Sequence, residues 1–291
     1  MREYLAEEIA FDYSDAILTR REALRRLGLL GLTASGAAAL LAACGGDGGG
    51  SKQTRKPGAS TTSGAPATAE AVTFRGLQGE LQGAWAKASD AKGAVLVIHE
   101  NRGLTDHIRS IPPRFAHDGY SAPAVDLLSE EGGTAGIGGE AEATAPLGRA
   151  APERLIADLR AGIDELARRD RNAKLGVVGF CFGGGLTWQL LAAGEPRLAA
   201  AAPFYGPTPE NPDFSGSKAA VLAVYAELDS RVNATRDVAV AALEAAGLTH
   251  EVRTFPGTDH AFFNDTGPRY NAAAASEAYQ AVLSWFATHL A

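Results

Sequence analysis

Two patterns of hydrophobic positions alternate from about residue 71 to the C-terminus. Continuous apolar runs predict buried strands, and apolar residues three or four positions apart predict helices. The predicted strands are residues 71–76, 79–87, 93–99, 120–126, 174–180, 198–206, 218–229 (ending in a loop) and 249–257. The predicted helices are residues 106–117, 152–169, 183–194, 233–247 and 270–290, and residues 128–148 read as a long glycine-rich loop. This alternation predicts an α/β domain with a doubly wound, mostly parallel sheet and helices on both faces.

The first 44 residues have a different pattern. Arg20 and Arg21 precede an apolar stretch at residues 27–43, which ends in Leu-Ala-Ala-Cys44. Positive charge, an apolar run, small residues and a cysteine in this order resemble a bacterial lipoprotein signal, in which the cysteine receives diacylglycerol and becomes the mature N-terminus. The stretch "TRREAL" resembles a twin-arginine signal, and the general secretory route stays open. The alternative is an ordinary amphipathic N-terminal helix.

Residues 45–70 consist almost entirely of small and polar residues. Such a segment cannot bury enough apolar surface to offset its ordering entropy, so it is expected to be a flexible linker. The expected organisation is therefore a signal at 1–44, a linker at 45–70 and a catalytic domain at 71–291. With Cys44 lipidated, the domain would be anchored to a bacterial membrane and face the periplasm or the cell exterior.

The composition argues against several classes of function. The net charge of −7 gives no electrostatic case for binding nucleic acid. Two cysteines, Cys44 and Cys181, do not form a disulfide framework. Cys, His and acidic residues nowhere cluster with the spacing of metal ligands, so neither a metal nor an organic cofactor is expected. We expect a monomer that acts on a small molecule.

The stretch "GVVGFCFGGG" contains the first motif that indicates a catalytic site. Gly179-Phe180-Cys181-Phe182-Gly183 follows a predicted strand and begins a predicted helix, which is the pattern of a nucleophile elbow with cysteine in place of serine. The sharp turn requires small residues on both sides. It places the sulfur at a helix N-terminus, where thiolate is favoured, and leaves the Phe182 N–H free for an oxyanion. Alone, the motif fits a buried structural cysteine equally well.

An acid and a histidine follow in the order that this motif requires. Asp229 lies in the loop that ends the segment 218–229, directly after its apolar strand, and His260 follows the strand at 249–257. We expect Asp229 to orient the imidazole and His260 to take the thiol proton. Glu227 and Asp259 are competing acids. The three residues in order make Cys181-His260-Asp229 the predicted triad.

The segments "VLVIHENRGL", "VVGFCFGGG", "APFYGP", "AELDSRV" and "GTDHAFFND" together resemble the dienelactone hydrolases (carboxymethylenebutenolidases), over about residues 72–291. This resemblance implies the α/β-hydrolase fold and the same triad. It also implies that Glu100 contacts the resting thiol and controls its ionisation, and that the Asn101 N–H completes the oxyanion hole. The expected function is hydrolysis of an ester or lactone through a thioester. The alternatives are a non-catalytic binding lipoprotein and a cysteine hydrolase of other esters or amides.

The sequence departs from this family's pattern around the substrate. Asn264 stands where an arginine four residues after the histidine would grip a substrate carboxylate, and His99 replaces a glutamine. Arg102 and Tyr205 are the candidate substrate-binding residues.

Overall fold

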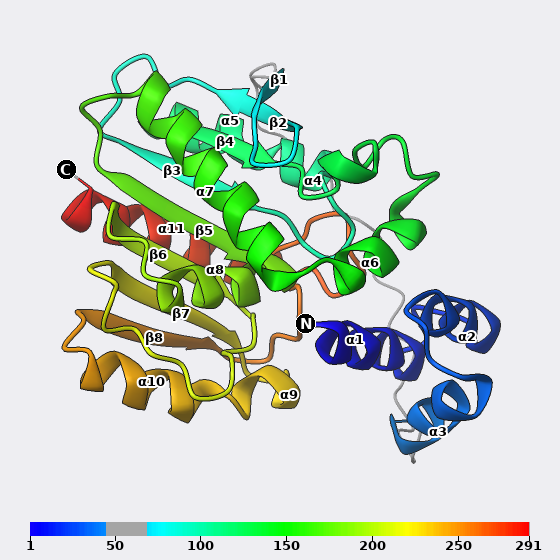
Figure 1. Cartoon of the computed structure of the whole chain (residues 1–291). Coiled ribbons are helices and arrows are strands. Elements are labelled where there is room, and N and C mark those ends of the chain that lie inside the picture. Colours follow the sequence, from blue (N-terminus) through cyan, green and yellow to red (C-terminus); the bar gives the residue numbers. More distant parts are fainter. Residues whose placement is uncertain (45–68, 291) are drawn as a thin grey trace.

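One eight-stranded sheet, in the order β1-β2-β4-β3-β5-β6-β7-β8, forms the centre of the protein (Figure 1). The computed structural model describes residues 1–44 and 69–290. β1 pairs with β2 and β2 with β4 in antiparallel fashion, and the remaining pairs are parallel. The strands are β1 (Glu70–Arg75), β2 (Glu80–Ala86), β3 (Gly93–Ile98), β4 (Tyr120–Val125), β5 (Leu175–Phe180), β6 (Leu198–Phe204), β7 (Ala220–Ala226) and β8 (His250–Phe255).

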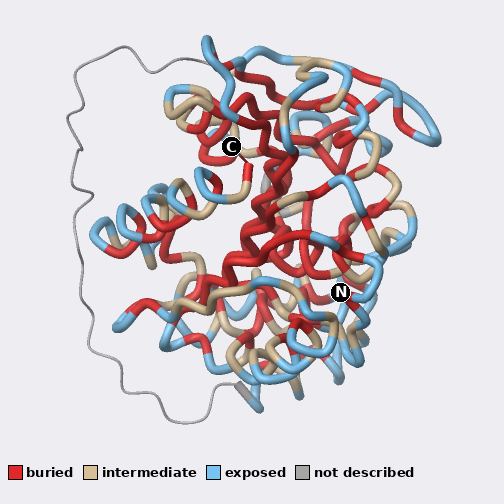
Figure 2. The backbone as a smooth tube through the Cα atoms, turned by 90° about the vertical axis from the view of Figure 1, so that its left-hand side faces the viewer, coloured by how far each residue is buried: buried red, intermediate tan, exposed pale blue. Residues whose placement is uncertain are grey.

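Helices cover both faces of the sheet, which confirms the predicted doubly wound architecture. α7 (Pro152–Arg169) and α8 (Phe182–Ala192) pack on one face, and α5 (Ile111–His117) and α11 (Ala272–His289) on the other. α9 (Ser230–Asn233) and α10 (Arg236–Ala245) connect β7 to β8. Figure 2 shows the consequence, a buried centre formed by the strands and the inner sides of these helices. Strands β3 to β7 are buried along almost their entire length, as their continuous apolar runs predict.

Two predicted segments differ from the structure. The residues expected to form one long loop contain a 3₁₀ turn, η1 (Ser129–Glu131), and a helix, α6 (Glu140–Arg149). The helix expected at 106–117 is two short helices, α4 (Asp106–Arg109) and α5. Pro112 and Pro113 lie in the first turn of α5, where their missing N–H groups cost no helical hydrogen bond.

Residues 2–44 form three helices: α1 (Arg2–Ser14), α2 (Arg20–Leu29) and α3 (Ala34–Cys44). They pack against one another, and α1 and α2 also contact α6 (Figure 1). Across the described part of the chain, every helix is too short or too polar to cross a membrane. The predicted linker lies outside the described residues except for positions 69 and 70. The export signal predicted for residues 1–44 stays a prediction.

Candidate active site

The carboxyl ends of β3, β5, β6, β7 and β8 meet at one edge of the sheet, where the predicted site residues follow them. Cys181 stands between β5 and α8 with φ 56° and ψ −116°, a strained conformation for a residue with a side chain. A Cβ atom on Gly179 would lie 2.1 Å from the carbonyl oxygen of Gly183. A Cβ atom on Gly183 would lie 2.4 Å from the carbonyl oxygen of Ile98. The elbow therefore requires both glycines, for the steric reason inferred from the sequence.

The structure brings the three predicted triad residues together. His260 Nδ1 lies 2.5 Å from Asp229 Oδ2, and both side chains are buried. A ring nitrogen of His260 also lies within 4.8 Å of Cys181 Sγ. The two competing acids have other partners, since Glu227 accepts from the backbone N–H of Gly257 and Asp259 from that of His260, both at 2.7 Å. Asp229 is thus the acid positioned to orient the imidazole.

Burial and charge act in opposite directions on the triad. Burial alone would lower the pKa of His260, but the carboxylates of Glu8 and Asp229 outweigh it and hold that pKa well above its usual value. Burial would raise the pKa of Asp229, and the charge and hydrogen bond of His260 bring it below its usual value instead. Burial, and then the nearby Glu8, raise the pKa of the Cys181 thiol. The site therefore favours a charged imidazole between two carboxylates.

The two residues expected to supply the oxyanion hole lie beside Cys181. Phe182 is the first residue of α8, where an N–H has no acceptor within its helix. Asn101 follows β3 in a buried turn and lines the same cavity as Cys181, and its carbonyl accepts a hydrogen bond from Thr144 Oγ1 at 3.2 Å. Both residues thus lie beside Cys181, and their role as the oxyanion donors expected from the sequence stays a prediction.

Glu100 is buried beside the site and bonded to an unexpected partner. Its Oε2 accepts from Asn264 Nδ2 at 2.6 Å, while its Oε1 is buried without a partner among the described residues. Burial raises the pKa of Glu100. The hydrogen-bond partner of Cys181 Sγ, however, is the hydroxyl of Tyr4 at 3.3 Å. The residue that replaces the expected arginine, Asn264, therefore holds Glu100.

The two candidate substrate-binding residues have different surroundings. Arg102 lines the cavity and is 36% exposed, and its guanidinium lies 3.7 Å from Asp12. Tyr205 is fully buried, and its ring packs edge-on against that of His260 with 5.1 Å between centroids. Arg102 therefore lines the cavity, whereas Tyr205 packs against the imidazole of His260; substrate binding by either residue stays a prediction.

Helix α1 contributes residues that sequence reasoning did not include in the site. Tyr4, Glu8 and Asp12 recur every four residues and lie on one side of α1, toward Cys181 and His260. Glu8 and Asp12 line the site cavity. The four-residue spacing of Tyr4, Glu8 and Asp12 is the feature of the sequence from which this face of α1 could have been predicted.

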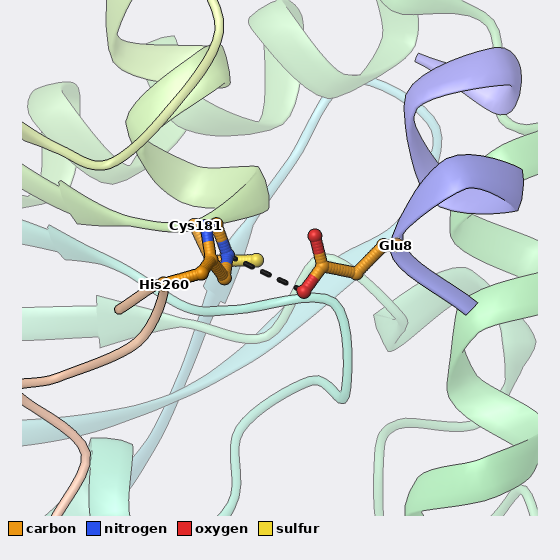
Figure 3. A group of neighbouring side chains, drawn as sticks. All are labelled: Glu8, Cys181 and His260. Atoms are coloured by element: carbon orange, nitrogen blue, oxygen red, sulfur yellow. Dashed lines mark ion pairs between the residues drawn. The ribbon is translucent and has the colours of Figure 1, made fainter. Parts of the chain in front are cut away.

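Glu8, Cys181 and His260 each offer an atom of a metal-ligand type, and these atoms lie within 4.8 Å of one another (Figure 3). However, Arg231 donates a hydrogen bond to the Glu8 carboxylate. A guanidinium already neutralises this carboxylate, which makes the cluster a poor place for a metal cation.

Comparisons with known proteins agree with this geometry. The sequence profile described as the dienelactone hydrolase family matches residues 81–290. A protein of Salmonella typhi named for carboxymethylenebutenolidase activity is 33% identical over 217 residues, which cover 70% of this chain and 80% of that protein. One from Synechocystis with the same name is 33% identical over 214 residues, covering 67% of this chain and 86% of the relative.

Solved structures show the same fold. A Klebsiella pneumoniae structure that bears the name of a dienelactone hydrolase superposes with a TM-score of 0.66 at 28% identity, covering 75% of this chain and 98% of its own. The dienelactone hydrolase-like phosphotriesterase P91, from metagenomic libraries, superposes with a TM-score of 0.65 at 21% identity, covering 77% and 99%. The chain therefore belongs to the dienelactone hydrolase family and is a hydrolase with the α/β-hydrolase fold.

Proposed function

We propose that this hydrolase cleaves ester or lactone bonds through a Cys181-His260-Asp229 triad and a thioester intermediate. The observation that carries the proposal is the 2.5 Å contact between His260 Nδ1 and Asp229 Oδ2, with the other edge of the imidazole turned toward a cysteine on a strained elbow. In this arrangement the acid fixes the tautomer, the imidazole moves protons and the sulfur attacks.

The chemical steps follow from these positions. As Sγ bonds to the carbonyl carbon, the thiol proton passes to His260, and the oxyanion accepts from the N–H groups of Phe182 and Asn101. The carbon–oxygen bond to the leaving group then breaks, and His260 returns the proton to the leaving oxygen. In the second half, His260 takes a proton from water, which attacks the thioester. Collapse releases the acid, and the proton returns to the thiolate.

Glu100 is proposed to restrain the thiol between turnovers. A carboxylate beside a thiol disfavours thiolate through like-charge repulsion, and the charge of Glu100 adds to the raised pKa of Cys181. The hydrogen bond from Asn264 keeps this carboxylate at the edge of the cavity.

Hydrolysis of p-nitrophenyl acetate and of a butenolide by the wild-type chain and by Cys181→Ala tests the mechanism. Cys181→Ala should remove turnover, and mass spectrometry of the quenched wild-type chain should show an acyl group on the peptide that contains Cys181. Turnover that survives in Cys181→Ala contradicts a cysteine nucleophile. A panel of aryl esters, lactones and amides then ranks the substrates.

We propose further that the chain is exported and anchored by diacylglycerol on Cys44, on the strength of the paired arginines, the apolar stretch and the Leu-Ala-Ala-Cys sequence. Mass spectrometry of the protein from the producing cell should find a lipidated N-terminal Cys44. An unprocessed N-terminus at Met1 in that preparation would rule the anchor out.

A further inference from the structure

Helix α1 covers the active site with a buried face. Tyr4, Leu5, Glu8, Ile9 and Asp12 are each less than one-tenth exposed. In Figure 1 this helix lies beside the edge of the sheet at which the parallel strands end, near α6 and α9. This face of α1 contains both apolar side chains and polar side chains, and the polar ones contact polar residues of the catalytic domain.

The carboxylate of Glu8 lies between two positive groups of the catalytic domain. Its Oε1 is 3.4 Å from His260 Nε2, and its Oε2 accepts a hydrogen bond from Arg231 Nη2. Figure 3 shows Glu8 extending from α1 toward Cys181 and His260. A charge-assisted pair of this kind, buried on both sides, defines a position for a carboxylate.

Arg231 is held in this position by α1 as well. Its guanidinium stacks over the rings of Tyr4 and Phe11, at 4.4 Å and 5.5 Å from their centroids. Its Nε and Nη1 are buried and have no hydrogen-bond partner among the described residues. Arg231 therefore retains donors for an anion besides the one that Glu8 accepts.

With α1 in place, the catalytic groups cannot perform the proposed reaction. His260 Nε2 must exchange a proton with the thiol and the leaving group, yet it faces the Glu8 carboxylate at 3.4 Å. The hydroxyl of Tyr4 contacts Cys181 Sγ. The cavity that remains has a volume of about 50 Å³, whereas small-molecule sites commonly measure about 300–1,000 Å³.

Ion pairs at the far end of α1 hold the same arrangement. Arg269 binds Asp12 at 3.0 Å and Asp15 at 2.5 Å, and Arg102 approaches Asp12 at 3.7 Å. The carboxylates of α1 thus form ion pairs with three arginines around the site: Arg102, Arg231 and Arg269.

We propose that α1 is an internal ligand of the active site, whose Glu8 fills a carboxylate-binding position formed by Arg231 and His260, and that α1 must leave before a substrate enters. This inference rests on the proposed hydrolytic function. Once α1 has left, the same position receives the carboxylate of the acid product, which forms beside Cys181 and His260. Processing before Cys44, as proposed above, would remove α1 with the leader.

The occlusion is tested in the full chain by two variants and a matched control. Leu5→Asp places a charge in the fully buried contact of α1, Glu8→Gln removes the carboxylate with little change in shape, and Glu3→Gln changes an exposed acid on the same helix. Iodoacetamide labelling of Cys181, followed by peptide mass spectrometry, and hydrolysis of p-nitrophenyl acetate are measured for each.

Leu5→Asp should raise both the labelling rate and kcat/KM at least tenfold, and Glu8→Gln several-fold, while Glu3→Gln stays within twofold of wild type. Unchanged labelling in both site variants overturns the inference, and so does a Glu8→Gln chain that loses the turnover of wild type, since Glu8 would then assist catalysis. Faster labelling without ester hydrolysis in any chain rejects the proposed function and leaves the occlusion standing.

The carboxylate position is tested with maleate as the probe. In the Leu5→Asp chain, maleate should inhibit hydrolysis of p-nitrophenyl acetate competitively. Adding Arg231→Gln should weaken this inhibition at least tenfold, whereas adding Arg236→Gln, at a partly exposed arginine that pairs with its neighbour Asp237, should leave it within twofold. Equal inhibition of the Arg231 and Arg236 double variants overturns the assignment of Arg231.

Discussion

Replacing Asp229 by asparagine separates the charge of this residue from its structural role. Asp229 Oδ2 contacts His260 Nδ1, while Oδ1 accepts the backbone N–H of Val232 and caps α9. Asparagine has nearly the same volume and is an equally good N-cap, so the cap and the packing are retained. The Asp229→Asn variant therefore loses the negative charge beside the imidazole of His260.

The expected loss of activity is large because the contact is short and buried. Both side chains are about one-twentieth exposed, so little solvent is present to replace the missing charge. The amide can also present its NH₂ group to Nδ1, which stabilises the wrong tautomer. Comparable substitutions of a triad acid lower kcat by about 10²- to 10⁴-fold, which corresponds to about 3–5 kcal/mol of transition-state stabilisation.

The assay compares kcat for p-nitrophenyl acetate with the midpoint of urea unfolding. Asp229→Asn should lose activity by that factor with an unfolding free energy within about 1 kcal/mol of wild type, since the cap remains. Glu227→Gln and Asp259→Asn are the controls, because their carboxylates bond to backbone N–H groups. Activity within threefold of wild type for Asp229→Asn, together with a large loss in either control, would show that another acid orients His260.

Two further substitutions probe the elbow and the buried acid. Gly183→Ala places a Cβ 2.4 Å from the Ile98 carbonyl oxygen, so urea unfolding should show a loss of about 3 kcal/mol or more; wild-type stability would contradict the close approach. Burial raises the pKa of Glu100 from its ordinary 4.5, so its ionised form destabilises the fold, a cost absent below pH 4.5 and complete above the folded pKa. The melting temperature of Glu100→Gln should therefore exceed that of wild type by more at pH 8 than at pH 4, and an equal difference at both would refute the shift.

The sheet and the elbow could be predicted from the sequence because their signals are local. The run at residues 174–180 predicts a strand, and β5 is Leu175–Phe180. A parallel strand buried on both faces must be continuously apolar, so its bounds are visible in the residues themselves. The two glycines around Cys181 are likewise explained by contacts within the turn and with the neighbouring strand end.

Helix α6 could not be predicted because its stability depends on distant contacts. Its sequence follows a glycine-rich stretch and contains Pro146, which breaks the local helical signal. Ala143 and Leu147 are nonetheless fully buried, and α6 packs against α1 and α2. Tertiary packing therefore overrides local propensity at this point.

The contact between α1 and the site could not be predicted from the sequence for a similar reason. Tyr4 and Cys181 are 177 positions apart, and the features of residues 20–44 that indicate export direct attention away from α1. The sequence did pose the question of which cation replaces the missing arginine, with Arg102 as the candidate. The structure shows that Arg231 and Arg269 also pair with carboxylates, those of Glu8 and Asp12 on α1.

The docking of α1 and catalysis are mutually exclusive, because both need His260 Nε2 and the space beside Cys181. Leu5, which is fully buried beside Gly148 of α6, favours docking by about 1.5–3 kcal/mol. The buried charges of Glu8 and Arg231 add much less, since their attraction is largely offset by desolvation. The apolar contact of Leu5 therefore sets how strongly α1 is held. The carboxylate sets where it is held, and the acid product can replace the charge pair but not the apolar contact. For this reason a substitution at Leu5 should release the site more than one at Glu8.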